Sequence, residues 1–148
     1  TELALARRYA SCARLASNDH AVRAYVAQVI DVENAQAARL LAARGEELDR
    51  ARAFLDGGER LDRATFLAAA AGPLDETDAR LARAFAGTGA LDSDDHDHAL
   101  AWQLATQARL RRIDPHGPAA AIHVLLRRRA EARRIRRAAW RVALGGAP

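Results

Sequence analysis

Apolar residues recur at the spacing of helical turns along most of the chain, and no segment alternates apolar and polar residues as a β-strand does. The longest such stretch covers residues 20–44, and Gly45 follows it in the position favoured for a left-handed C-terminal cap. On a helical wheel one side of this stretch collects Val22, Val26, Val29, Val32, Leu40 and Ala43. Glu33 falls on that side, whereas Asp31 points away from it. Because a carboxylate in an apolar stripe is costly unless it is paired, we expect Glu33 to be buried against a specific partner.

Turn and capping residues divide the rest of the chain into further helices. The cluster Ser17-Asn18-Asp19 ends a helix over residues 2–16 and can cap the long one. Asp62 resembles the cap of a helix over residues 63–71, which Gly72-Pro73 ends. Pro118 is placed for the first turn of a last helix that runs to residue 144. Further helices are expected over residues 46–55, 75–86 and 94–112, so the pattern predicts an all-α bundle of about seven helices.

The last part of the chain repeats a residue spacing of the long helix. Each copy has a ring-bearing residue, a glutamate and an arginine at the same intervals: Tyr25, Glu33 and Arg39 first, then His123, Glu131 and Arg137. Such internal similarity indicates repeated structural units. We therefore expect a single all-helical domain over residues 1–148, in which residues 22–72 and 118–148 begin two related units.

The composition agrees with closely packed helices. Half of the residues are hydrophobic, many of them alanine, and only 5% are aromatic. The formal net charge is +4, and all 23 basic residues are arginine. The one cysteine, Cys12, excludes an internal disulfide and has no neighbouring base that would make it a nucleophile. No secretory signal and no apolar run of membrane-spanning length is found in the chain.

Three segments resemble a known family, the C-type central-stalk subunits of A-type and V-type rotary ATPases. Residues 25–45, YVAQVIDVENAQAARLLAARG, are similar to the family's helix Y-F-x(n)-D-[LV]-E-N-[IL]-[KR]. The d-type central-stalk subunit of the eukaryotic V-ATPase belongs to the same family. Asp31, Glu33 and Asn34 occupy the positions of the D-[LV]-E-N motif.

The other two segments follow in the order of that family. Residues 55–70 resemble its P-G-G-x-L-x(n)-F segment, with Gly57 and Gly58 in place and Asp56 instead of the usual proline. Residues 114–148 resemble its last helix, although no asparagine follows Glu131 in the usual position and His123 stands where tyrosine is common.

The resemblance implies a structural role. Members of the family consist of three related helical units around a funnel, so we expect this chain to be a fragment or a short member of the family. Those members sit on the cytoplasmic side of the membrane rotor ring and receive the end of the central shaft. The resemblance therefore implies a non-catalytic coupling protein, peripheral to the membrane through its complex, with the shaft and ring proteins as partners. It implies no cofactor, no metal and no small-molecule substrate.

Two glutamates and one acidic segment are the candidates for site chemistry. Glu33 and Glu131 are interpreted as structural carboxylates that hold helices together, because the Glu-x-x-His pattern of a bundle metal site is absent. Residues 94–98, DDHDH, form the segment densest in potential ligands. His96 and His98 would point in different directions on a helix, so we interpret the segment as an acidic first turn behind the cap Ser93. The alternative left open is a metal-dependent helical enzyme that uses these groups.

Arginines crowd the last predicted helix. They surround it on nearly all sides and alternate with apolar residues, a pattern that favours a solvated or partner-facing helix over a nucleic-acid stripe. The candidate partner-binding residues are Arg127, Arg128, Arg133, Arg134 and Arg141. The alternative function is therefore a basic helical adaptor that binds nucleic acid or anionic surfaces.

Overall fold

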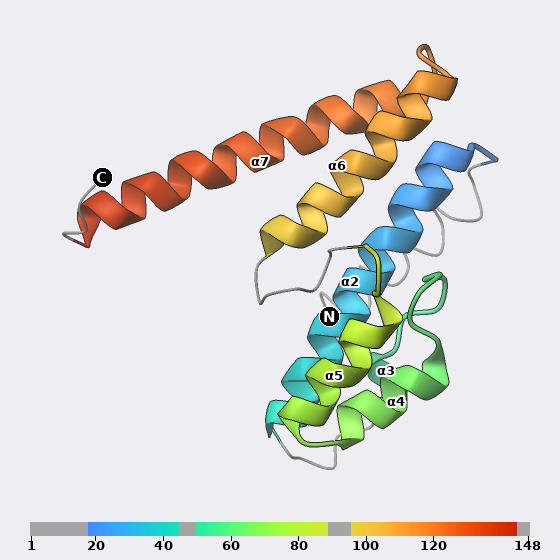
Figure 1. Cartoon of the computed structure of the whole chain (residues 1–148), viewed down its shortest axis with the longest axis vertical. Coiled ribbons are helices and arrows are strands. Elements are labelled where there is room, and N and C mark those ends of the chain that lie inside the picture. Colours follow the sequence, from blue (N-terminus) through green and yellow to red (C-terminus); the bar gives the residue numbers. More distant parts are fainter. Residues whose placement is uncertain (1–17, 45–49, 89–95, 145–148) are drawn as a thin grey trace.

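Six α-helices make up the part of the chain that the computed structural model describes, which comprises residues 18–44, 50–88 and 96–144 (Figure 1). They are α2 (His20–Arg44), α3 (Arg50–Ala53), α4 (Arg63–Ala71), α5 (Leu74–Ala84), α6 (His96–Ile113) and α7 (Pro118–Ala143). Within those ranges the prediction of an all-α protein is confirmed. The expected helix over residues 2–16, together with Cys12, Gly45, Ser93, Asp94 and Asp95, lies outside the described residues.

Three predicted helix starts, those of α2, α4 and α7, are confirmed, whereas α5 begins at Leu74 instead of residue 75 and the helix expected over residues 46–55 ends at Ala53. Asp19 accepts hydrogen bonds from the backbone N–H of Ala21 at 2.8 Å and of Val22 at 3.1 Å, so it caps α2. Asp62 accepts one from the N–H of Thr65 at 2.7 Å and caps α4. Pro118 occupies the first turn of α7. These caps depend on contacts over two or three residues, which is why the sequence alone predicts them.

The helices form two groups along α2. The short helices α3, α4 and α5 pack on its C-terminal half, while α6 and α7 form an antiparallel hairpin that lies beside its N-terminal half (Figure 1). The hairpin turns through a tight connector, in which Asp114 Oδ1 accepts a hydrogen bond from the N–H of His116 at 3.2 Å. The far end of α7 projects beyond α6 (Figure 1). Among the described helices, none is long and apolar enough to cross a membrane.

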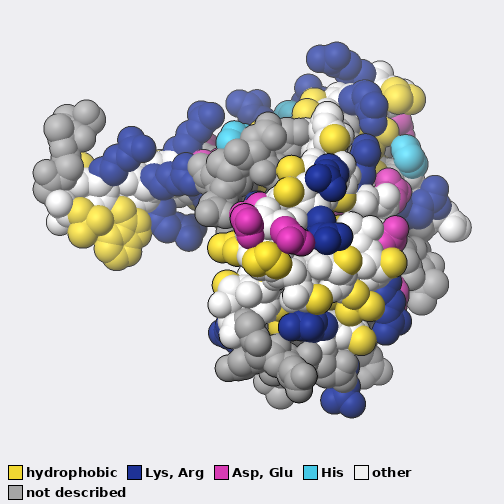
Figure 2. Space-filling model, turned by 60° about the horizontal axis from the view of Figure 1, so that its bottom comes forward, with side chains coloured by type: hydrophobic (Ala, Val, Ile, Leu, Met, Phe, Trp, Pro, Cys, Tyr) yellow, Lys and Arg dark blue, Asp and Glu magenta, His cyan; other side chains and the backbone are white. Residues whose placement is uncertain are grey.

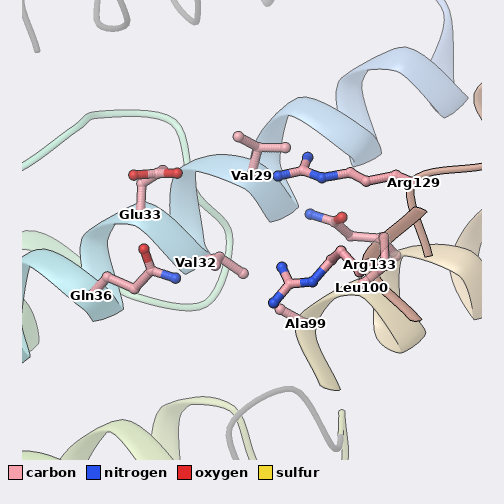
Figure 3. Close-up of a pocket in the computed structure, with 9 residues that line it drawn as sticks. Val29, Val32, Glu33, Gln36, Ala99, Leu100, Arg129 and Arg133 are labelled. Atoms are coloured by element: carbon pink, nitrogen blue, oxygen red, sulfur yellow. The ribbon is translucent and has the colours of Figure 1, made fainter. Parts of the chain in front are cut away.

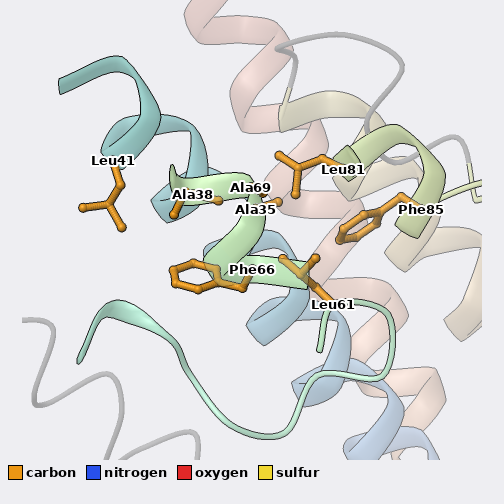
Figure 4. Close-up of a cluster of buried hydrophobic side chains, with 9 residues drawn as sticks. Ala35, Ala38, Leu41, Leu61, Phe66, Ala69, Leu81 and Phe85 are labelled. Carbon is orange, nitrogen blue, oxygen red and sulfur yellow. The ribbon is translucent and has the colours of Figure 1, made fainter. Parts of the chain in front are cut away.

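The main core lies between α2, α4 and α5 (Figure 4). Its buried members are Ala35, Ala38, Leu41, Leu61, Phe66, Ala69, Ala70, Leu81 and Phe85. Alanines on α2 and α4 let the two backbones approach closely. The ring of Phe66 packs in this core against the ring of Phe54, and the two ring centroids are 5.3 Å apart. Phe85 meets Trp102 edge to face at 5.9 Å, which connects this core to α6.

The buried side of α2 differs from the expected one. Leu40 is 60% exposed, whereas Asp31 and Asn34 are among the most deeply buried side chains of the described residues. Glu33 is exposed, so its predicted burial is wrong. The reason is that α2 is covered from two directions. The short helices and a loop cover the side that carries Ala35 and Ala38, and the α6–α7 hairpin only partly covers the valine side.

Candidate functional site

Four of the residues that carry the family resemblance, Asp31, Asn34, Gly57 and Gly58, meet where α2 contacts the loop over residues 55–61. Asn34 donates a hydrogen bond from its Nδ2 to the carbonyl of Leu55 at 2.9 Å, and its Oδ1 accepts one from the N–H of Leu55 at 2.8 Å. The side chain of Asn34 therefore satisfies both backbone groups of a buried residue. We call Asp31, Asn34 and the loop 55–61 the motif corner.

Asp31 completes the motif corner. Its carboxylate accepts hydrogen bonds from the backbone N–H groups of Glu59, Arg60 and Leu61 at distances between 3.0 and 3.2 Å. Burial raises the pKa of Asp31 above its usual value of 3.8, and the three backbone hydrogen bonds oppose that rise. Asp31 thus anchors the loop through its backbone, whatever side chains the loop carries.

The two glycines of the loop are required by this arrangement. Gly57 has a φ of 113°, which side-chain-bearing residues rarely adopt. A Cβ atom on Gly58 would stand 2.1 Å from Oδ1 of Asp31, so only glycine leaves room for the carboxylate. Asp31, Asn34, Gly57 and Gly58 are therefore one constellation that folds the chain back onto α2. It binds backbone and has no reacting group open to a substrate.

A small cavity lies between α2 and the α6–α7 hairpin (Figure 3). It measures about 60 Å³, well below the roughly 300 Å³ of small-molecule sites. Glu33 lines it from α2, and the side chains of Arg129 and Arg133 extend toward α2 from α7 (Figure 3). Arg133 forms an ion pair with Asp97 of α6, with its Nε 3.1 Å from Oδ1. Its guanidinium group therefore already has an acidic partner within the hairpin.

The arginines of the repeated spacing both form ion pairs, but in different surroundings. Arg39 Nε contacts Asp78 Oδ1 at 2.7 Å and ties α2 to α5. Arg137 pairs with the other oxygen of Asp97, so that carboxylate receives two arginines of α7.

The ring-bearing residues of the repeated spacing, Tyr25 and His123, are both half-buried. Burial, with the charges of Arg111 and Arg127, lowers the pKa of His123 below 6.5. The imidazole is therefore neutral at physiological pH and adds no charge to the arginines around it.

Glu131 is exposed, so the interpretation that it holds helices together from a buried position is wrong. It lines a hollow of about 470 Å³ between α6 and α7. Arg127, Arg128 and Arg134 line the same hollow. Three of the five predicted partner-binding arginines are thus brought together, and another, Arg141, is exposed toward the free end of α7.

The predicted acidic ligand segment is only partly described. Asp97 lies in the first turn of α6, and His98 is exposed. Among the residues that the structure describes, no three His, Cys, Asp or Glu side chains come close enough together to hold a metal ion.

Sequence reasoning missed the parts played by Asp31 and Asn34. A signal was available, because Ala27, Asp31, Asn34, Ala38 and Leu41 follow one another at alternating intervals of four and three, which places them on one side of a helix. Two polar residues in such a stripe indicate buried hydrogen-bond partners. The partners themselves lie in a loop that no local pattern connects to α2.

Comparison with known proteins adds no relative to this description. No family model, curated protein or solved structure matches the chain.

Proposed function

We propose that this protein is a non-catalytic component of a rotary ATPase of the A or V type and couples the rotating shaft to the ion-translocating membrane ring. The observation that carries the proposal is the motif corner. Two of the segments that resemble the central-stalk family, 55 to 70 and the D-V-E-N stretch of α2, bind each other through hydrogen bonds of Asp31 and Asn34, and Gly58 leaves room for the Asp31 carboxylate. A resemblance whose separate parts contact one another is stronger support than the same residues scattered over the surface.

The arrangement of the helices supports a mechanical role. A coupling protein has to transmit torque, which requires stiff elements with large docking surfaces rather than a catalytic cleft. α2 and α7 are long helices, each supported along part of its length, and α7 presents exposed arginines beyond the bundle (Figure 2). Such a surface suits the docking of an acidic partner protein.

The test is a pull-down of the tagged chain from detergent extracts of its own cells, with the partners identified by mass. We expect ring and shaft proteins of the rotary ATPase among those recovered. The comparison chain is a variant with Asn34→Ala and Asp31→Ala, which lacks the anchoring side chains of the motif corner. It is used only if its circular dichroism shows that the helices are retained. If the pull-down recovers no rotary ATPase component from extracts in which that complex is present, the proposal is overturned.

A basic adaptor that binds nucleic acid is the second candidate, and the exposed arginines of α7 favour it. It predicts that the chain binds duplex nucleic acid with an affinity that falls steeply as salt is raised. Fluorescence anisotropy with a labelled duplex at two salt concentrations distinguishes it, since a rotary coupling protein requires no such binding.

A further inference from the structure

On the outward side of α7, three large apolar residues recur at positions that a heptad repeat assigns to its a and d sites. Position a is occupied by Arg128, Ile135 and Val142. Position d is occupied by Val124, Glu131 and Ala138. All six are exposed, and the three large apolar ones are Val124 at 48%, Ile135 at 64% and Val142 at 67% exposure. We call these six residues the outer seam. At 1.5 Å per residue it runs for about 27 Å along the helix.

The outer seam differs from the stripe of α7 that is buried against α6, although Val124, Arg128 and Glu131 of the seam also line the hollow toward Leu104 of α6. The inner side carries Ala119 and Leu126, both almost fully buried, and Arg133 and Arg137, which pair with Asp97. A helix that already buries one stripe normally exposes a polar opposite face. α7 instead exposes Val124, Ile135 and Val142 there, together with Arg128, Glu131 and Ala138.

Arginines follow one edge of the outer seam at heptad spacing. Arg127, Arg134 and Arg141 each precede an a position and therefore occupy position g, and all three are exposed. None of them has an ion-pair partner among the described residues. Position e on the opposite edge carries Leu125, Ala132 and Ala139, which have no charge.

The hollow between α6 and α7 lies along the same arginine edge. Arg127 and Arg134 line it, and Leu104 of α6 with Val124 and Ala130 of α7 provide apolar surface. A helix laid on the outer seam would therefore meet apolar atoms flanked by guanidinium groups.

We propose that the outer seam of α7 is the docking site for an amphipathic helix of a partner protein, with Asp or Glu at the positions that face Arg127, Arg134 and Arg141. In coiled coils, the charges at positions e and g determine which helices pair with each other. The inference refines the docking surface named under the proposed function by specifying the kind of partner element, and it rests on α7 and its hollow alone.

A second copy of this chain does not fit the outer seam. In an antiparallel pair the g arginines would face each other and repel. In a parallel pair they would face Leu125, Ala132 and Ala139, which lack a carboxylate. The complementary charge therefore has to come from a different chain.

The experiment measures binding of labelled helical peptides to the full chain by fluorescence anisotropy. The acidic probe has about four heptads with Leu at a and d and Glu at e and g. A basic probe has Lys at e and g, and a third probe keeps the acidic composition but scrambles the order of its seam. Uniform charge at e and g prevents each ordered probe from pairing with itself.

We expect the acidic probe to bind about tenfold or more tightly than the basic and scrambled probes. The triple variant Arg127→Glu, Arg134→Glu and Arg141→Glu should reverse the preference between acidic and basic probes. A triple variant with Arg63→Glu, Arg83→Glu and Arg109→Glu makes the same change in net charge at exposed arginines of α4, α5 and α6, and should leave the order of the probes unchanged.

The double variant Ile135→Ser and Val142→Ser removes exposed apolar contacts while leaving every charge in place, so it should weaken acidic-probe binding with unchanged circular dichroism. Equal binding of the ordered and scrambled acidic probes would overturn the proposal, because it would show attraction by charge alone.

Three other outcomes would also overturn it. They are an unchanged order of the probes on the α7 triple variant, a dimer in sedimentation that requires Arg134, and preferential binding of RNA or anionic vesicles at the outer seam. A pull-down without rotary components would contradict the proposed function and leave the peptide result untouched.

Discussion

Asn34 and Leu55 are joined by two reciprocal hydrogen bonds, in which the Asn34 amide donates to the Leu55 carbonyl at 2.9 Å and accepts from its N–H at 2.8 Å. Both residues are buried, so neither backbone group of Leu55 can turn to water instead. One side chain on α2 therefore holds the start of the loop that carries Gly57 and Gly58.

Replacing Asn34 should destabilise the protein much more than replacing its neighbour Glu33. Asn34→Ala leaves the buried N–H and carbonyl of Leu55 unpaired, at about 1–3 kcal/mol for each group. Glu33→Ala should change the free energy of unfolding by no more than about 0.5 kcal/mol, because Glu33 is exposed. Urea unfolding followed by circular dichroism measures both. Similar losses in the two variants would contradict the contacts of α2 described above.

The variant Gly58→Ala should lose about 1–3 kcal/mol, because its methyl group pushes the Asp31 carboxylate away from three backbone N–H groups. Gly72→Ala is the matched control. Its φ of −86° is open to any residue, and the nearest atoms to an added Cβ stand at 3.6 and 3.7 Å. Thermal unfolding of the two variants should therefore differ clearly, with the control near the parent chain. A loss of stability at Gly72 as large as at Gly58 would mean that alanine at glycine positions is costly for another reason.

Asp31 should make the protein less stable as the pH rises above 3.8. Burial raises the pKa of Asp31 in the folded state, so between 3.8 and that raised value the folded chain keeps a proton that the unfolded chain has released. The folded state then binds more protons, and the free energy of unfolding falls with increasing pH through this window. The stabilising contribution is complete below a pH of 3.8.

The variant Asp31→Asn isolates this effect, because its side chain does not titrate. The difference in unfolding free energy between the parent chain and the variant should decline as the pH rises through the window, when measured in urea at a series of pH values. A difference that grows with pH would show that the backbone hydrogen bonds outweigh burial.

Asp97→Ala should weaken the attachment of α7 to α6 by about 0.5–1 kcal/mol, because that carboxylate serves both Arg133 and Arg137 in a partly exposed position. A double-mutant cycle with Arg133→Ala separates this ion pair from the loss of an acid in the first turn of α6. Glu76→Ala is the control, because it removes an exposed ion pair that lies within a single helix. Glu76 and Arg80 of α5 are 3.4 Å apart. Coupling that does not decrease as salt is raised would contradict an electrostatic origin.

Local interactions made much of this fold predictable from the sequence. Helical spacing predicts α2 and α4 with the bounds that are observed, and Asp19, Asp62 and Pro118 mark helix starts because each acts on N–H groups or a backbone angle within its own first turn. The same reasoning selected the wrong side of α2, because the valine side is the more apolar one, whereas the buried side combines small alanines with Asp31 and Asn34.

Only the tertiary structure decides which acid of the D-V-E-N stretch is buried. Asp31 finds its partners 28, 29 and 30 positions further along the chain, and Asn34 finds its partner 21 positions away. A helical wheel cannot reveal these pairings, because they depend on how the loop returns over α2. The outer seam of α7 is the reverse case. Its heptad spacing is present in the sequence by itself, but only the packing of α6 on the other side of α7 leaves it exposed for a partner.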